Sequence, residues 1–359
     1  MSVCFCWLTG WQDGRYQVGA HRGISERARA RAAGPSRRPR LARPPQPTAL
    51  ARLAAAGCLA LVLAICLAAC GGSGATGGGA TSADETDGPA YTVPDQVQLA
   101  PMDEAAATAA NDSAIDTSHV ADGYVSAHAT SDIRLKFLVT SGDQTYAYDI
   151  PGDGTPTSFP LNMGDGAYTF RVMRNTSGNN YVEINSAAAD VALSSEFAPY
   201  LRPNVFCNYT GDSACVAKAA ELAAGAQNEG DVVRAVFDYV TENVTYDNDK
   251  AAELANAEGY IPDPDETLAS GSGICFDYAS LGAAMLRSLG IPTRIVTGYV
   301  SPSNIYHAWI MVYIDGSWHS ARLSVDPDTW TRVDLTFAAG SGSTDYVGDG
   351  KEYTDRFIY

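Results

Sequence analysis

Basic residues are scarce in this chain of 359 residues, and those present are unevenly distributed. Lys and Arg number 24 against 41 Asp and Glu, which gives a formal net charge of −17. Residues 1–69 hold 10 of the basic residues and 2 of the acidic ones, so the remainder carries a net charge of −25. A segment this acidic has no basic face with which to displace counterions from nucleic acid, and anionic lipid would repel it. We therefore expect no nucleic-acid partner.

The sequence also lacks the usual signatures of metal and nucleotide sites. It has no H-E-x-x-H motif, no pair of cysteines at zinc-ligand spacing and no glycine-rich phosphate loop. We therefore expect no metal ion and no other cofactor.

The N-terminal segment has the pattern of an export signal. An Arg- and Pro-rich stretch precedes an apolar run from Leu53 to Ala69, which ends in small residues before Cys70. Leu67-Ala68-Ala69-Cys70 resembles a bacterial lipobox, in which the cysteine is lipidated and becomes the new N-terminus. A transmembrane anchor is the alternative, although the run is shorter than the ~20 residues that a spanning helix needs. We expect residues 1–69 to be removed and Cys70 to anchor the exported chain on the outer face of the cell membrane.

Residues 70–118 begin with Gly- and Ser-rich sequence and continue as an acidic stretch rich in Ala and Thr. Because Gly/Ser chains behave as flexible coil, we expect a flexible tether here. Disorder without a tethering role predicts the same structure.

Residues 119–200 show short alternating runs separated by turn residues. The alternation is clearest over 133–139, 145–150, 167–173 and 181–184. Apolar and polar residues that alternate with a period of two indicate strands. We predict a small antiparallel β-rich domain, which serves for packing or for presenting substrate.

Helical and extended patterns are mixed over residues 201–359, which predicts an α+β domain. Helices are expected over 214–226, after an Asp231 cap, and from Cys275 to Leu289, where Gly290 and Pro292 end the helix. Strands are expected over 295–300, 306–314, 318–325 and 330–337. Asp315-Gly316 predicts a two-residue hairpin between the second and third of these strands.

Three cysteines follow Cys70. Cys207 and Cys215 enclose a short loop that is compatible with a disulfide in an oxidising compartment, and the sequence leaves open whether the bond forms. Cys275 then remains as an odd thiol. It follows a Gly-rich loop and begins a helix, where the helix dipole favours the thiolate. A buried structural cysteine is the alternative interpretation.

Four histidines follow Cys70 in the sequence. His119 and His128 lie in or beside the β-rich domain, and His319 lies on a later strand. His307 opens the strand over 306–314, on the face opposite its alternating apolar residues. A general base for a cysteine must be oriented through its second ring nitrogen, usually by a carboxylate or amide.

Together these segments resemble the transglutaminase-like superfamily, whose fold is related to papain-like cysteine proteases. The resemblance covers roughly residues 200–359. It rests on these segments in order: 239–246, 263–265, Gly273-Ile274-Cys275-Phe276-Asp277-Tyr278-Ala279, Gly290-Ile291-Pro292-Thr293-Arg294, Gly298-Tyr299, His307-Ala308-Trp309 and 330–337. It implies a helix carrying the cysteine, packed on an antiparallel sheet that carries His and Asp, after the small β-domain.

The resemblance assigns Cys275 as the nucleophile and His307 as the general base. The family pattern W-x-x-x-D-x-T fits Trp330 to Thr336 and makes Asp334 the third catalytic residue, although Leu335 stands where the family usually has Pro. Asp326 is the alternative, because hairpin pairing around Asp315-Gly316 would bring it near His307.

This triad implies acyl transfer at amide or peptide bonds through a thioester. Water as the acceptor gives a peptidase or deamidase, and an amine gives cross-linking. The expected partner is a protein or peptide substrate, and the exported location suggests one associated with the cell wall. A catalytically silent binding or scaffolding lipoprotein is the alternative function.

Overall fold

The computed structural model describes residues 84–255, 257–301, 304–320, 323–341 and 353–359. The expected signal segment and Cys70 lie outside these residues. Within the described ranges, no helix combines the length and apolarity needed to cross a membrane.

Residues 108–191 contain two four-stranded antiparallel sheets. One has the strand order β2-β3-β4-β7 and the other β6-β5-β8-β9. Their aromatic side chains meet: the ring of Phe137 on β5 lies 4.4 Å from that of Phe159 on β7. The strands are β2 (Thr108–Ala110), β3 (Ser113–Asp116), β4 (Tyr124–Ala129), β5 (Leu135–Ser141), β6 (Gln144–Ile150), β7 (Thr157–Pro160), β8 (Gly166–Ser177) and β9 (Asn180–Val191). The β-rich prediction is confirmed for these residues.

The tether prediction is wrong for residues 84–118. Strand β1 (Glu85–Asp87) pairs with β14, and β2 and β3 form part of the first sheet. The Tyr91 hydroxyl donates to the Leu289 carbonyl at 2.8 Å. The composition of this stretch did not reveal its structure, because its strands and its few large side chains contact residues far away in the sequence. Residues 70–83 lie outside the described part of the chain.

The remaining residues form the mixed α/β core that the sequence predicts. Its helices are α1 (Ala214–Ala223), α2 (Glu229–Asn243), α3 (Asn248–Leu254), α4 (Pro264–Ser270), α5 (Cys275–Ser288) and α6 (Leu335–Ser341). Its strands are β10 (Thr245–Tyr246), β11 (Ser272–Gly273), β12 (Thr293–Val300), β13 (Ile305–Val312), β14 (Ser317–His319), β15 (Ser324–Val325), β16 (Thr331–Val333) and β17 (Tyr353–Ile358).

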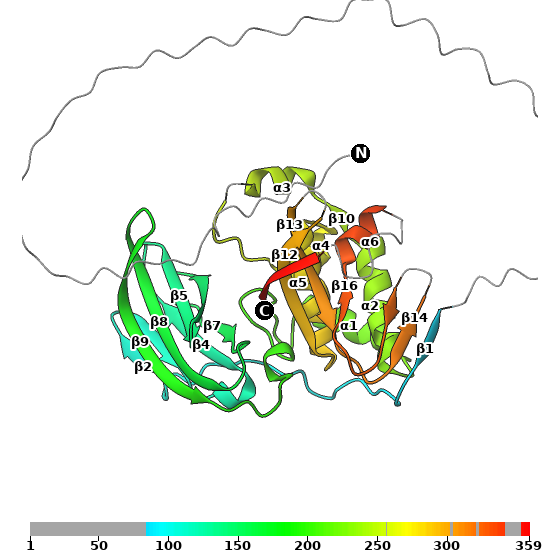
Figure 1. Ribbon diagram of the computed structural model, residues 1–359, viewed down its shortest axis with the longest axis horizontal. Helices are drawn as coiled ribbons and strands as arrows, with labels where there is room; N and C mark the ends of the chain where they lie inside the picture. The colour runs from blue at the N-terminus through cyan, green and yellow to red at the C-terminus, as the bar shows by residue number, and fades with distance from the viewer. Residues whose placement is uncertain (1–83, 256, 302–303, 321–322, 342–352) are drawn as a thin grey trace, which may run out of the picture. The chain divides into compact units, whose positions relative to one another are not determined.

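Helix α5 is buried along its whole length and lies against β12 and β13 (Figure 1). It ends at Ser288, and Gly290 follows with φ of +79°, as the Gly-Pro signal predicts. Gly282 permits its close packing, because a Cβ there would lie 2.4 Å from a Leu335 methyl group of α6. Any larger residue at position 282 would push α5 and α6 apart.

The main sheet has the order β16-β13-β12-β17, which corrects the predicted hairpin. Strand β13 pairs with β12 and β16, whereas β14 pairs with β1 and β15 in another sheet. Asp315-Gly316 therefore leads the chain out of the sheet. The strand predicted over 330–337 is also shorter, because α6 begins at Leu335. The cap of α2 is Asn228, whose side chain accepts from the Asp231 amide, and not Asp231 itself.

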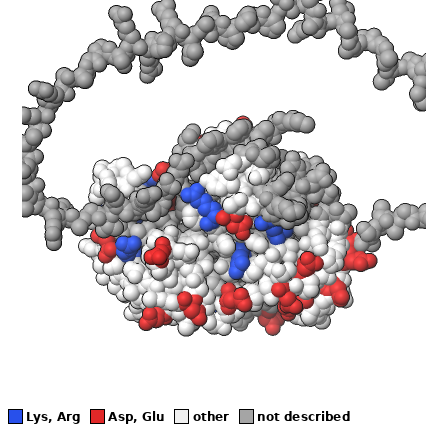
Figure 2. Space-filling view, in the orientation of Figure 1, with Lys and Arg blue, Asp and Glu red and all other residues white. Residues whose placement is uncertain are grey.

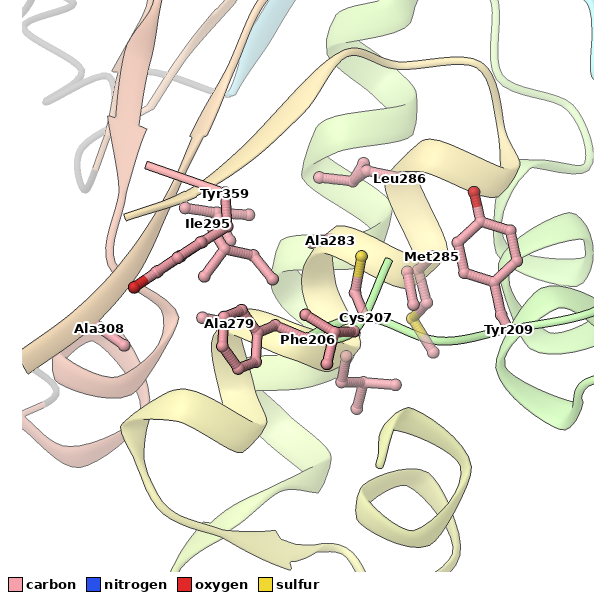
Figure 3. Close-up of a cluster of buried hydrophobic side chains, with 14 of the residues drawn as sticks. Phe206, Cys207, Tyr209, Ala279, Ala283, Met285, Leu286, Ile295, Ala308 and Tyr359 are labelled. Atoms are coloured by element: carbon pink, nitrogen blue, oxygen red, sulfur yellow. The ribbon is translucent and has the colours of Figure 1, made fainter. Parts of the chain in front are cut away.

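The β-rich part and the α/β core share one hydrophobic cluster. Tyr148 of β6 contacts the rings of Phe206 and Tyr359, at 5.7 and 6.1 Å. Figure 3 shows Phe206 and Tyr359 beside Ala279 of α5. The two predicted domains, 119–200 and 201–359, therefore pack as one compact unit.

Cys207 and Cys215 are buried thiols and form no disulfide. Figure 3 shows Cys207 among Ala283 and Met285. Burial raises the pKa of Cys207, and burial together with the Asp265 carboxylate raises that of Cys215. The short loop was compatible with a bond, but the structure has both cysteines as free thiols.

Arg287 on α5 is 1% exposed and donates to three backbone carbonyls, of Thr293, Arg202 and Tyr359, at 2.8, 2.9 and 2.9 Å. It thereby joins segments far apart in the sequence. We expect Arg287→Met to lower the free energy of unfolding by about 3 kcal/mol, because these carbonyls lose charged donors. Urea unfolding measures the change, and Arg174→Met, at an exposed position, should change little. Equal effects of the two substitutions would contradict this role.

Asp265 of α4 accepts from the backbone amides of Cys215 and Ala214 at the start of α1, at 2.8 and 3.2 Å. Burial raises its pKa, but these hydrogen bonds outweigh burial and leave the pKa below the usual 3.8. The unfolded chain therefore binds this proton more readily, so the stabilisation is present above the unfolded pKa and is lost as pH falls through the folded one.

We expect Asp265→Asn to reduce the loss of stability between neutral pH and about pH 3. Urea unfolding at both pH values measures it. The exposed Asp212→Asn is the control and should leave the acid dependence unchanged. An acid dependence equal to wild type in Asp265→Asn would contradict the expectation.

Candidate active site

Cys275 is the first residue of α5 and is 1% exposed. The two residues of β11 before it pair in parallel with β10, which fixes the approach to the helix. The Asp277 carboxylate accepts from the Ile274 amide at 2.8 Å and caps the first turn. The thiol thus lies at the positive end of a buried helix, where the helix dipole acts on it.

His307 and Asp334 are joined by a buried hydrogen bond. Nε2 of His307 lies 2.8 Å from Oδ2 of Asp334, and the two side chains are 1% and 0% exposed. The imidazole stacks on the Phe337 ring, with centroids 4.3 Å apart and an interplanar angle of 10°. The position and orientation of the ring are therefore fixed.

The Asp334 side chain is held by two further hydrogen bonds. Its Oδ1 accepts from the Phe337 amide at 3.0 Å at the start of α6, and its Oδ2 accepts from the Tyr353 hydroxyl at 2.9 Å. Strand β16 brings it to His307 because Val333 pairs with Ile310 of β13. Asp326, the alternative from hairpin pairing, is exposed and follows β15 in the other sheet.

The bond to Asp334 leaves Nδ1 as the second nitrogen of His307. Nδ1 is buried, and among the described residues it makes no hydrogen bond. Because the carboxylate accepts the Nε2 proton, Nδ1 carries the lone pair. This nitrogen is therefore the basic atom of the site.

The neighbours of Cys275 and His307 line a common cavity of about 40 Å³. Phe276 and Tyr306 form two of its walls, and Thr297 accepts from the Tyr306 hydroxyl at 2.8 Å. Burial raises the pKa of Tyr306 to about 12, and the charge of Cys275 is among the smaller causes. The structure thus joins His307 to Asp334, and residues that adjoin Cys275 and His307 in the sequence line one cavity.

The other candidate histidines lie elsewhere. His319 is exposed and contacts Ser324, His128 contacts Glu104, and His119 contacts Asp122. In the part of the chain that the structure describes, no group of three His, Cys, Asp or Glu side chains is arranged to hold a metal ion.

Two side chains that support the site, the Asp277 carboxylate and the Tyr353 hydroxyl, were not predicted from the sequence. Asp277 stands three residues after Ile274, at the spacing by which an acidic side chain caps the start of a helix, and this pattern was open to recognition. Tyr353 had no such signal, because β17 reaches the site only by pairing with β12.

A comparison with curated proteins gives two relatives. A stretch of 93 residues is 32% identical to the uncharacterised protein ML0607 of Mycobacterium leprae (strain TN), covering 23% of this chain and 29% of that protein. A stretch of 113 residues is 32% identical to the uncharacterised protein YebA of Bacillus subtilis (strain 168), covering 26% of this chain and 15% of YebA. The matched region thus spans less than a third of either relative.

Among solved structures, the periplasmic domain of TgpA from Pseudomonas aeruginosa, bound to ethylmercury, is similar over 68% of this chain and 79% of that chain. The TM-score is 0.29 and the sequence identity 16%. Residues 216–335, about a third of the chain, match the model of a family described as the transglutaminase-like superfamily. This match encloses Cys275, His307 and Asp334, and it shows that residues 216–335 are similar to the transglutaminase-like superfamily.

Proposed function

We propose that this protein is a cysteine acyltransferase or hydrolase that acts on amide bonds of protein or peptide substrates. The buried bond between His307 Nε2 and Asp334 carries the proposal, because it fixes the ring and leaves Nδ1 as the base. A domain that only binds has no need of a buried, oriented imidazole beside a thiol at a helix start. The family match supports cysteine-based chemistry.

In the proposed reaction, His307 Nδ1 takes the proton from the Cys275 thiol, and the thiolate attacks the substrate carbonyl carbon. The oxyanion is stabilised by backbone N–H groups at the start of α5. The imidazolium then returns the proton to the leaving amine, the C–N bond breaks, and a thioester remains. Water or an amine gives its proton to Nδ1 and attacks the thioester, which releases the product and restores the thiol.

We further propose that the chain is exported and anchored through lipid at Cys70, so that its substrates are peptides or proteins at the cell wall. The acidic composition after residue 69 supports a substrate that is not a polyanion. On the face shown in Figure 2, acidic side chains follow the lower edge and a few basic ones lie nearer the centre.

Incubation of the full-length chain with glutamine-bearing peptides, with and without a primary amine, tests the function. Mass spectrometry separates deamidation, amine adducts and backbone cleavage. We expect Cys275→Ser and His307→Ala each to lower turnover about a thousandfold or more, because they remove the nucleophile and its base. His319→Ala, at an exposed histidine, is the matched control and should retain activity. Full activity of Cys275→Ser would rule out the mechanism, and a lack of turnover by the wild-type chain would leave the binding lipoprotein.

Asp334 offers a second test, since its role is to accept the Nε2 proton. An Asn oxygen also accepts this proton, whereas Ala removes the acceptor and the α6 cap together. We expect kcat to fall at least about a hundredfold in Asp334→Asn, because an uncharged amide does not stabilise the imidazolium, and further still in Asp334→Ala. Steady-state kinetics measure both, with near-ultraviolet circular dichroism to verify folding. Equal activity of the two variants would contradict an orienting role.

A further inference from the structure

A buried carboxylate lies two residues beyond Cys275 and takes no part in the reaction described above. The Asp277 side chain is 0% exposed. Besides the Ile274 amide, it binds the Lys250 ammonium at 2.9 Å and accepts a hydrogen bond from the Tyr260 hydroxyl. Helix α3, the segment before α4 and the start of α5 therefore converge on one carboxylate next to the nucleophile.

Lys250 is held in place by the same loop that leads to Cys275. Its backbone amide donates to the Asp247 side chain at 2.8 Å, and the Asp247 amide donates to the Gly273 carbonyl at 2.9 Å. Gly273 lies directly on Asp277, since a Cβ there would come 2.6 Å from the Asp277 Cβ. Backbone hydrogen bonds and close packing therefore connect the Lys250 segment to the loop before Cys275.

The β-rich part of the chain supports Tyr260. Its neighbour Gly259, with φ of +78°, packs so closely that a Cβ would lie 2.9 Å from the Asp149 carboxyl carbon of β6. Arg134 donates to Asp149 at 2.7 Å and also binds Glu258. Burial raises the pKa of Tyr260, and its bond to Asp277 raises it further. The hydroxyl therefore stays protonated and remains a donor.

The charge of Asp277 acts against the nucleophile. A carboxylate within one helical turn of a thiol disfavours the thiolate, and an adjacent ammonium offsets this effect. Tyr306 of β13 lines the cavity, and the charges of Glu266 and Asp263 act on Tyr260 more weakly than the charge of Asp277 does. Lys250 is the cation that the structure pairs with Asp277, and it also lies 5.0 Å from the Tyr260 ring centre.

We propose that Lys250 and Asp277 are positioning residues that form one charge-compensated pair, which fixes the Cys275 loop and keeps the thiol able to ionise. Tyr260 is the neutral third member, which holds the carboxylate in place from the β-rich side. The proposal rests on the proposed function for its significance, but it makes a separate prediction about the thiol.

The test is the rate of iodoacetamide alkylation of Cys275 against pH in the full-length chain, resolved from other cysteines by peptide mass spectrometry. Lys250→Met leaves an uncompensated carboxylate and should raise the midpoint pH by about half a unit or more, slowing alkylation about threefold below the midpoint. Asp277→Asn leaves an uncompensated ammonium and should lower the midpoint. The double variant should return it close to wild type.

Tyr260→Phe is the matched control, since it removes a neutral donor and should shift the midpoint less than Lys250→Met. Continued protection of the buried Cys207 and Cys215 shows that each variant is folded. Midpoints that move in the same direction in Lys250→Met and Asp277→Asn, or that do not move, overturn the proposal. A purely structural disturbance would not shift the midpoint in opposite directions according to the charge that was removed.

The two proposals fail in different ways. A change of the alkylation midpoint in His307→Ala and a loss of turnover in Cys275→Ser test the proposed function alone. Opposite shifts in the single variants concern the charge pair alone. The acidic limb of kcat/KM against pH gives a second measurement and should move in the same directions as the alkylation midpoint.

Discussion

The buried hydrogen bond between His307 and Asp334 is the interaction on which the rest of the site depends. It joins β13 to the start of α6, selects the ring nitrogen that carries the lone pair, and makes the capping residue of a helix the partner of the base. Burying an imidazole and a carboxylate costs free energy unless each is satisfied. Phe337 stacks on the ring and Tyr353 donates to the carboxylate, so the helix, the sheet and the histidine are positioned together.

A second buried carboxylate organises the other half of the site. At the first turn of α5, the Asp277 carboxylate binds the Ile274 amide, the Lys250 ammonium and the Tyr260 hydroxyl. Through Tyr260 and its neighbours, this cluster reaches Arg134 and Asp149 in the β-rich part. The β-rich sheets are thus coupled to the loop that carries Cys275, which gives them a role in the site beyond packing or presentation.

Local sequence patterns predicted correctly the elements whose structure depends on residues close by in the sequence. The helix from Cys275, its end at Gly290 and the alternating strands of the β-rich part were all predicted, since each depends on neighbours in the sequence. Prediction was wrong where the partner is distant. Asp315-Gly316 has the chemistry of a hairpin, yet β14 pairs with β1, some 230 residues earlier in the chain. The tether prediction was wrong over residues 84–118 for the same reason.

The sequence by itself determined the residue types at the site. A cysteine after a Gly-rich loop and a histidine at the start of a strand can be recognised from their order and spacing in the sequence. Its acidic charge led us to expect no nucleic-acid partner. Only the tertiary structure decided which aspartate meets His307, since that depends on the pairing of β13 with β16. The structure likewise decided that Cys207 and Cys215 stay reduced and that Lys250 compensates Asp277, because side chains from distant segments meet only once the core has packed.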